Sequence, residues 1–436
     1  MDFIADVRLT DGPVFWTACA LGAASAVYLL WRPASPGTRP WWLSVLLSVA
    51  CGFAAVGLVH WALIDVFSTF PEDLPDDVLL WSVPAVAALI LAVLRMPRSS
   101  MRQRSAGITA FLLVLLLSGV QINAYFGLNR TVSDLMGTAL ARIPVLETGL
   151  MRQPGGPSPV SLDGWAPQGD IPGEGALRKA AIPGTASGLE AREAYIYLPP
   201  AYFAANRPSL PVLVLFSGQP GGPADWLTGG ALRTRMDEFA SGHGGVAPVV
   251  VVADPNGTQS ANTLCLDSQI ARADTYLAVD VPAWISATLD VDPAHSQWAV
   301  GGFSFGATCA LQMGTRHPDL YRSVLAFSSE LEPALAKERQ KTIDAAYAGD
   351  TAAFDRETPL ARMSHERFDS SAVYFAAGER DPEFVGYMDT LADAARNAGF
   401  TVEARQVQHA GHSWDTPSRG MADGLEFLAS RWGIKP

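Results

Sequence analysis

The stretch Trp298–Leu311, WAVGGFSFGATCAL, holds the pattern on which the fold of the C-terminal part of the chain depends. The apolar WAV predicts a short strand, GFSFG at residues 302–306 predicts a tight turn, and the small residues that follow predict the start of a helix. Glycines leave room for a sharp turn around Ser304, and a helix N-terminus favours negative charge beside it. Ser304 is therefore either a nucleophile on a strained turn or one serine in a glycine-rich loop, and only its partners can decide.

Short apolar runs alternate with helix-like segments from about residue 175 to the C-terminus. The runs are EAREAYIYLP, LPVLVLFSG, APVVVVA, QWAVGG, YRSVLAFS, SAVYFAAG and TVEARQVQ. This alternation predicts an α/β fold in which helices cover both faces of a mostly parallel sheet. Because sites in such sheets form at the carboxyl ends of the strands, we expect the partners of Ser304 in the loops that follow strands.

A serine hydroxyl needs a general base to become a good nucleophile. His412 is the predicted base, because it follows the last strand and completes the chain order serine, acid, histidine. His409 is its rival, although a structural role at the end of the strand explains that residue more simply. The acid that orients the base is predicted to be Asp381, in the turn after SAVYFAAG and just before a proline that starts the next helix, with Glu379 as the alternative.

The oxyanion formed by nucleophilic attack needs two N–H donors that are already in position. One is predicted to be the backbone N–H of Phe305, next to the nucleophile. The other is predicted to be that of Gln219, which follows Gly218 in VLVLFSGQPGG. The alternative is that this glycine-rich segment is only a turn.

The chain has four cysteines, of which Cys265 and Cys309 fall in the C-terminal domain. Both follow strands of the same predicted sheet, so we expect a disulfide between them. The alternative is that Cys309 is only a small buried residue of its helix. There is no CxxC pair, and the HxxH of residues 409–412 lacks a third ligand, so neither a metal nor a cofactor is expected.

Four apolar segments lie within the first 124 residues, and they predict an all-α four-helix transmembrane segment. They span residues 14–31, 41–67, 78–94 and 108–124. Each reaches the roughly 17 to 25 residues that cross a bilayer as a helix. A soluble bundle fits less well, because its helices usually keep a polar stripe. A cleaved signal peptide also fits less well, because the N-terminus MDFIADVRLTDG is acidic where such peptides are basic.

The distribution of arginine predicts the orientation of these segments, since positively charged loops stay in the cytoplasm. The loop STFPEDLPDD, between the second and third segments, is acidic and has no basic residue. The other two loops carry Arg32, Arg39, Arg95, Arg98, Arg102 and Arg104. The N-terminus and everything after residue 124 are therefore expected outside the cytoplasm.

Three domains follow from these patterns. They are the transmembrane segment at 1–124, a juxtamembrane helix and linker at 125–174, and an exterior α/β domain at 175–436. An amphipathic helix is expected over about 125–153, followed by the Pro/Gly-rich linker QPGGPSPVSLDGWAPQGDIPGEG. The net charge of −12 argues against a nucleic-acid partner, which would need clustered Lys and Arg.

With these residues identified, residues 175–436 resemble the esterase D-type α/β-hydrolases, especially the secreted mycolyltransferases of the antigen 85 group. The resemblance rests on the SGQ loop with Trp226 downstream, TYLAVDVPAWI, GGFSFGATCAL followed by RHPDLYRSVLAFS, and GHSW. The membrane segment looks like that of actinobacterial membrane-anchored esterases. The resemblance implies an α/β-hydrolase fold and a serine esterase that works through an acyl-enzyme. The anchor adds the expectation of a lipid or cell-envelope ester, such as an aminoacylated phospholipid or an acylated glycolipid.

Two positions depart from the mycolyltransferase pattern. Ser217 stands where those enzymes have an Asp that contacts the trehalose acceptor, and the predicted acid is Asp381 where theirs is a Glu. Hydrolysis is therefore the expected reaction, and acyl transfer to a sugar hydroxyl is the alternative. A hydrolase-fold binding protein without activity is the third hypothesis.

Overall fold

The computed structural model describes residues 5–32, 40–97, 99–153, 155 and 159–435. The chain forms two compact units, each with a core of its own. The first consists of Met1–Ala139 with Leu335–Glu338, and the second consists of Leu140–Ala334 with Arg339–Pro436.

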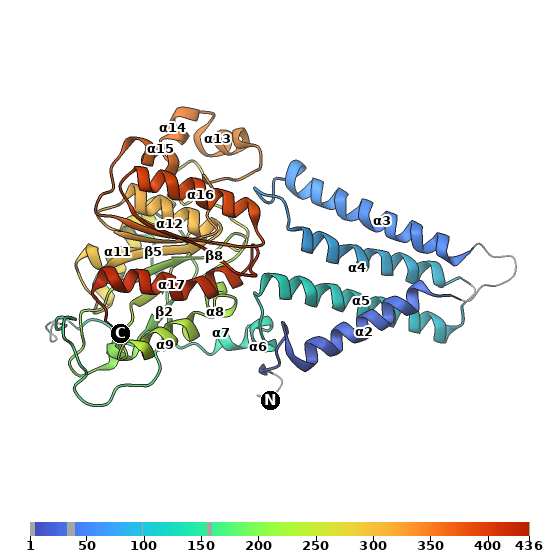
Figure 1. Cartoon of the computed structure of the whole chain (residues 1–436), viewed down its shortest axis with the longest axis horizontal. Helices are drawn as coiled ribbons and strands as arrows, with labels where there is room; N and C mark the ends of the chain where they lie inside the picture. The colour runs from blue at the N-terminus through green and yellow to red at the C-terminus, as the bar shows by residue number, and fades with distance from the viewer. Residues whose placement is uncertain (1–4, 33–39, 98, 154, 156–158, 436) are drawn as a thin grey trace. The chain divides into compact units, whose positions relative to one another are not determined.

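The first unit is built from four long apolar helices (Figure 1). They are α2 (Gly12–Leu30), α3 (Trp41–Trp61) continued by the π-helical turn η1 (Ala62–Val66), α4 (Asp76–Arg95) and α5 (Met101–Phe126). All four are long and apolar enough to cross a membrane, as the sequence predicts, and no more than 28% of the most apolar stretch of any of them is buried within the unit. A small cluster around Leu29, Leu91 and Val114 holds the helices together, so most of the apolar surface remains available to lipid.

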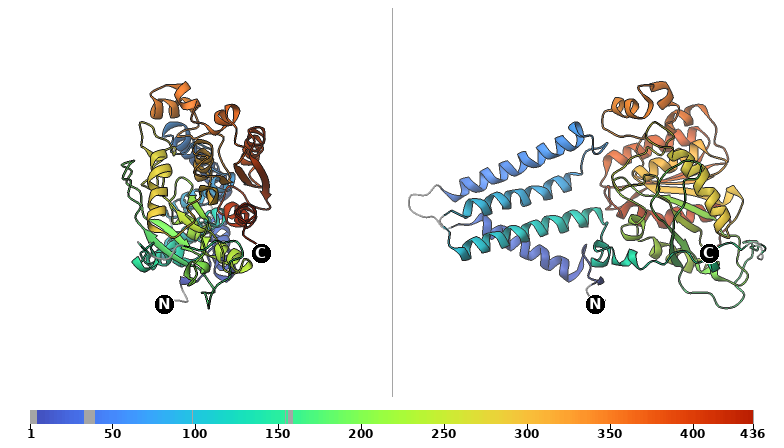
Figure 2. Two further views of the ribbon diagram at one scale, coloured as in Figure 1. Left: turned by 90° about the vertical axis from the view of Figure 1, so that its left-hand side faces the viewer. Right: turned by 180° about the vertical axis from the view of Figure 1, so that it is seen from behind.

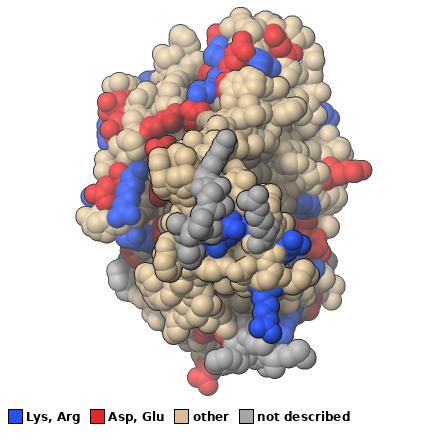
Figure 3. All heavy atoms as spheres, turned by 90° about the vertical axis from the view of Figure 1, so that its right-hand side faces the viewer, with Lys and Arg blue, Asp and Glu red and all other residues tan. Residues whose placement is uncertain are grey.

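Arg95, at the end of α4, closes the C-terminal end of α2. Its Nη2 donates to the backbone oxygens of Tyr28 at 2.5 Å and Leu29 at 3.1 Å, and also to that of Trp31. The last carbonyls of a helix have no partner within the helix and attract positive charge, so this contact stabilises α2. Figure 3 shows this end of the helices face-on, with Lys and Arg side chains near the centre among uncharged atoms.

Two of the arginines used to predict the orientation, Arg39 and Arg98, lie outside the described residues.

The amphipathic helix expected over residues 125–153 is not present, and this expectation was wrong. Helix α5 ends at Phe126, and only α6 (Val132–Leu135), α7 (Thr138–Ala141) and the 3-10 turn η2 (Thr148–Leu150) follow. Gly127 and Gly137 both have a φ of 65°, a left-handed conformation that ends a helix. The described part of the linker is docked rather than free, since Trp165 Nε1 donates to the oxygen of Asn206 at 2.7 Å.

The second unit contains an eight-stranded sheet of order β1-β2-β4-β3-β5-β6-β7-β8. The strands are β1 (Ala176–Ala180), β2 (Ala194–Leu198), β3 (Val212–Phe216), β4 (Val249–Val252), β5 (Trp298–Phe303), β6 (Ser323–Phe327), β7 (Ala372–Gly378) and β8 (Thr401–Val407). The pairs β1–β2 and β2–β4 are antiparallel, and all the others are parallel. Strands β3 to β7 are buried along their whole length, because helices cover both faces of the sheet.

The helices of this unit form a layer on each side of the sheet (Figures 1 and 2). One layer contains α11 (Val281–Thr288), α12 (Phe305–Arg316), α15 (Pro359–His365) and α16 (Pro382–Asn397), and the other contains α9 (Leu232–Gly242) and α17 (Asp415–Trp432). The remaining helices of this unit are η3 (Pro200–Phe203), α8 (Asp225–Thr228), α10 (Ala273–Thr275), η4 (Tyr276–Asp280), η5 (His295–Gln297), α13 (Arg339–Tyr347) and α14 (Thr351–Asp355). Helix α12 is buried from Phe305 to Thr315, so the residue at its N-terminus is firmly held.

Candidate active site

Ser304 occupies the turn between β5 and α12 in a conformation that serine rarely adopts. Its φ is 54° and its ψ is −124°, which costs backbone energy and persists only where the surroundings enforce it. Its N–H donates to the oxygen of Phe327 at 2.9 Å, and its carbonyl accepts the N–H of Ala307 at 2.8 Å. A Cβ at Gly302 would lie 2.1 Å from the oxygen of Gly306, so the turn can form only with glycine there.

The structure brings Ser304, His412 and Asp381 into one line of hydrogen bonds. His412 Nε2 lies 3.0 Å from Ser304 Oγ, and His412 Nδ1 lies 3.0 Å from Asp381 Oδ2. The His412 and Asp381 side chains are 15% and 11% exposed, so both are largely shielded from solvent. This arrangement can deprotonate a serine hydroxyl and stabilise the imidazolium that results.

Two aromatic rings and a helix cap hold the histidine and the acid in place. The imidazole of His412 packs on the ring of Phe384, with centroids 4.1 Å apart, and near that of Phe303 at 5.2 Å. Asp381 is the N-cap residue of α16, and its carboxylate also accepts the N–H of Phe384 at 3.5 Å. The carboxylate position is therefore set by the start of the helix.

The alternative base and the alternative acid pair with each other. Glu379 Oε2 accepts the N–H of His409 at 2.8 Å and lies 3.5 Å from its Nδ1. The side chains of His409 and Glu379 are 70% and 48% exposed. This pair closes the turn after β8.

The segment after β3, residues 217–224, lies directly against the turn at Ser304 and is called the β3–α8 loop below. A Cβ at Gly218 would be 3.7 Å from the Cβ of Ser304, and the peptide bond between Gln219 and Pro220 is cis. Phe305 is the first residue of α12, where helix N–H groups have no partner within the helix. Both predicted oxyanion donors, Gln219 and Phe305, thus belong to backbone that adjoins Ser304.

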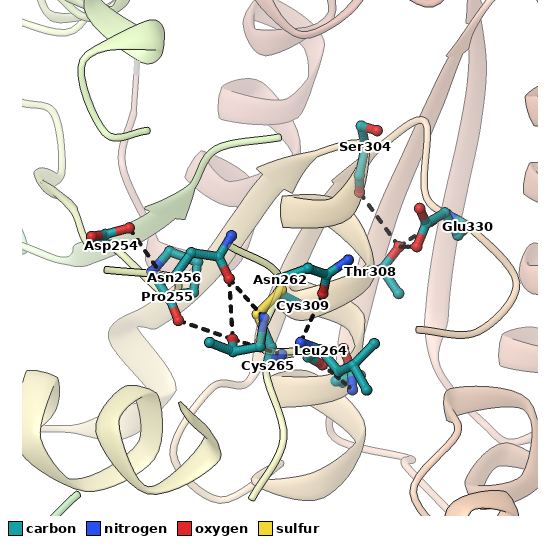
Figure 4. Close-up of a disulfide and its surroundings, with 12 residues drawn as sticks. Asp254, Pro255, Asn256, Asn262, Leu264, Cys265, Ser304, Thr308, Cys309 and Glu330 are labelled. Carbon is teal, nitrogen blue, oxygen red and sulfur yellow. Dashed lines mark hydrogen bonds between the residues drawn. A yellow bond between two sulfur atoms is a disulfide. The ribbon is translucent and has the colours of Figure 1, made fainter. Parts of the chain in front are cut away.

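A disulfide lies close to the turn at Ser304 (Figure 4). It joins Cys265 to Cys309 with a Cα–Cα distance of 5.4 Å. Beside it, Thr308 Oγ1 lies 3.4 Å from the carbonyl oxygen of Ser304 and accepts the N–H of Glu330 at 3.0 Å. The start of α12 is thereby tied to the loop after β4 on one side and to the loop after β6 on the other.

Sequence reasoning missed several residues around the site. Arg192 and Asp254 form an ion pair beside the β3–α8 loop, and Thr308 bridges two segments next to Ser304. An Asp followed by Pro-Asn-Gly directly after a buried strand is a signal that could have identified Asp254. Nothing in the sequence distinguishes Thr308 or Arg192. Among the residues that the structure describes, no cluster of three or more His, Cys, Asp or Glu could hold a metal ion.

Comparison with known proteins yields a family match and a curated relative. The model of the family described as putative esterase matches residues 189–424, more than half of the chain. An uncharacterized protein of Corynebacterium glutamicum is 35% identical over 280 residues, a match that covers 62% of this chain and 65% of that protein. The matched region therefore spans less than two thirds of that relative.

Solved structures show the same fold. A ferulic acid esterase is 18% identical with a TM-score of 0.50, covering 59% of this chain and 99% of its own. An S-formylglutathione hydrolase from Agrobacterium tumefaciens is 20% identical with a TM-score of 0.50, covering 61% of this chain and 98% of its own. The predicted α/β-hydrolase fold, preceded by four apolar helices, is confirmed.

Proposed function

The chain belongs to the putative esterase family, and from this premise we propose that it is a serine hydrolase that cleaves a carboxylic ester through an acyl-enzyme. The observation that supports this most strongly is the pair of 3.0 Å contacts joining Asp381, His412 and Ser304. A protein that only binds ligands has no need of an acid, a histidine and a serine joined by hydrogen bonds in this order. The inactive binding protein is therefore the weakest of the three hypotheses.

The reaction begins when Ser304 Oγ attacks the ester carbonyl carbon while His412 Nε2 takes the hydroxyl proton. Asp381 holds the imidazole and stabilises its charged form without taking the proton. The N–H groups of Phe305 and Gln219 bind the oxyanion of the tetrahedral intermediate. When the intermediate collapses, the bond to the leaving alcohol breaks and His412 gives that alcohol the proton, which leaves an acyl-serine.

Water completes the cycle by attacking the acyl-serine as His412 removes one of its protons. The second tetrahedral intermediate collapses, the acid leaves, and Ser304 recovers its proton. Acyl transfer would replace this water with a sugar hydroxyl. Ser217 argues for hydrolysis, because it stands where the mycolyltransferases have the Asp that contacts the acceptor.

The four apolar helices support a substrate that is found at the membrane. We therefore propose a lipid or cell-envelope ester, such as an aminoacylated phospholipid or an acylated glycolipid, with the catalytic unit outside the cytoplasm. Products would distinguish the two reactions. With an added sugar acceptor, a hydrolase releases free acid, whereas a transferase forms a sugar ester.

The test of the activity uses the full chain in detergent, a fluorophosphonate probe and a short-chain aryl ester. Ser304→Ala and His412→Ala should each lower kcat by about 10³-fold or more, and the double variant should be little worse because the two residues act as a unit. His409→Ala is the matched control and should keep near-normal turnover. If the probe labels Ser304→Ala as strongly as the wild type, Ser304 is not the nucleophile. If His409→Ala loses activity while His412→Ala keeps it, the base is His409 and not His412.

The test of orientation uses an impermeant thiol reagent on intact cells. Cys19 and Cys51, the two cysteines outside the disulfide, are first replaced by alanine. A cysteine at Asp77, in the acidic stretch at the start of α4, should then be labelled, whereas one at Arg102, at the start of α5, should not. Labelling at Arg102 alone would place the catalytic unit in the cytoplasm.

A further inference from the structure

We propose that Arg192, in the connection between β1 and β2, is a positioning residue that sets where the β3–α8 loop presents its oxyanion donor. The inference rests on the proposed serine hydrolase function. Arg192 acts through Gly221 of that loop, two residues beyond Gln219.

Arg192 is itself held rigidly by Asp254, which is fully buried. Arg192 Nε donates to Asp254 Oδ2 and Nη2 donates to Oδ1, each at 2.8 Å. The same carboxylate accepts the backbone N–H groups of Arg192 at 2.8 Å, Asn256 at 3.1 Å and Gly257 at 3.0 Å. A bidentate pair in which the buried carboxylate is fully hydrogen-bonded fixes the plane of the guanidinium.

The guanidinium, once fixed, lies directly on the backbone of the β3–α8 loop. Arg192 Nη2 donates to the oxygen of Gly221 at 3.0 Å. A Cβ at Gly222 would come within 2.6 Å of Arg192 Nη1, so only glycine allows this close approach. Moving the loop away from Arg192 therefore breaks a charge-assisted hydrogen bond.

The loop after β4, which carries Asp254 (Figure 4), also contacts the β3–α8 loop directly. The N–H of Gly221 donates to the oxygen of Gln259 at 2.9 Å, and Gln219 Nε2 donates to that of Ser260 at 3.1 Å. The Cys265–Cys309 disulfide ties this second loop to α12, one turn after Ser304. The donor backbone and the nucleophile are thus connected through one continuous set of contacts that includes Arg192.

A positioning role differs from a purely structural one in what it changes. An oxyanion donor that is out of place weakens binding of the tetrahedral state and leaves ground-state binding of the ester largely intact. Lysine cannot restore the arrangement, because its single ammonium cannot bond both Asp254 oxygens and Gly221 in one plane. Loss of Arg192 should therefore reduce kcat and weaken the binding of inhibitors that mimic the oxyanion, with little effect on KM.

The experiment measures kcat, KM and the inhibition constant of an aryl boronic acid, which forms a tetrahedral adduct on serine, with the full chain in detergent. In Arg192→Met and Arg192→Lys, kcat should fall by about 10-fold or more, since a fully lost oxyanion donor costs about 10²- to 10³-fold. The boronate inhibition constant should rise by a similar factor, and KM should stay within about threefold.

Arg207→Met is the matched control, because Arg207 pairs with Asp290 at 2.5 Å and both of these residues precede strands, at the amino ends opposite the site. It should lower Tm without changing kcat or boronate binding. If Arg192→Met does not fold, Gly222→Ala displaces the guanidinium from the loop without removing the ion pair, and it should give the same kinetic pattern.

Two outcomes overturn the inference. An active wild type whose Arg192→Lys and Gly222→Ala variants keep normal kcat and boronate affinity refutes the inference alone. A wild type that neither hydrolyses esters nor reacts with the fluorophosphonate refutes the proposed function, and this inference with it.

Discussion

Replacing Gly306 by alanine tests whether the close contact between α12 and the end of β3 supports catalysis. A Cβ at this position would lie 2.3 Å from the oxygen of Phe216 and 2.6 Å from that of Ser217. Both are backbone atoms, so no side chain can rotate away to make room. The added methyl group must push α12 and the start of the β3–α8 loop apart.

The size of the displacement follows from these distances. A real Cβ essentially never lies closer than 3.0 Å to such an atom, so the two segments must separate by at least about 0.7 Å. Overpacking of this kind costs about 1–3 kcal/mol of stability. Helix propensity alone predicts that the substitution stabilises the protein, since alanine is favoured over glycine by about 1 kcal/mol in a helix interior. Because a misplacement of about 1 Å can cost about 10²-fold in rate, we expect kcat to fall by roughly that factor.

The assay compares kcat per folded protein and Tm for Gly306→Ala and Gly314→Ala. Gly314 lies on the same helix, and a Cβ there would come within 2.3 Å of Val324 Cγ2, a side-chain atom at the other end of α12. Gly314→Ala should therefore lower Tm and leave kcat unchanged, whereas Gly306→Ala should lower both Tm and kcat. A Gly306→Ala protein that is destabilised but turns over at the wild-type rate would refute the reasoning.

Three further predictions concern the acid, the disulfide and pH. In the aryl ester assay, Asp381→Asn should lower kcat by about 10⁴-fold, and Glu379→Gln should change it by less than about threefold. If Glu379→Gln has the larger effect, Glu379 and not Asp381 is the acid. Cys265→Ala should lower the free energy of unfolding by about 2–4 kcal/mol. If Cys265 of the wild-type protein is alkylated under denaturing conditions without a reducing agent, the bridge is absent. Burial would by itself raise the pKa of Asp274, but hydrogen bonds from a neighbouring histidine and arginine outweigh it and lower that pKa. The stability that this carboxylate contributes is present above its unfolded pKa of about 3.9 and is lost as the pH falls through its pKa in the folded state. The difference in Tm between wild type and Asp274→Asn should therefore become smaller below about pH 4. A difference that grows there would contradict this prediction.

The parts of the structure that follow from local pattern could be predicted from the sequence. The parallel strands, the turn at Ser304 and the four apolar helices each depend on periodicity or composition within a short window. The helix expected over residues 125–153 failed for a local reason as well. Its apolar spacing is typical of a helix, but Gly127 and Gly137 adopt left-handed conformations that end one.

The choice between Asp381 and Glu379 could not be settled by pattern, because both follow the same strand within three residues. The structure separates them through their neighbours. Asp381 caps α16 and contacts His412, whereas Glu379 caps the turn at His409. Each pairing joins segments about 30 residues apart, and no single stretch of sequence contains that information.

The β3–α8 loop shows the same limit more sharply, and it explains why mutations far from Ser304 in sequence should act on kcat. Its glycines and two prolines identify it as a turn, but they do not determine which N–H faces Ser304. That direction is imposed from outside by α12 at Gly306, by Arg192 at Gly221, and by the backbone at Gln259. Because three separate segments each set one boundary, a change in any of them should move the same proposed oxyanion donor. We therefore expect their effects on kcat to be less than additive when combined.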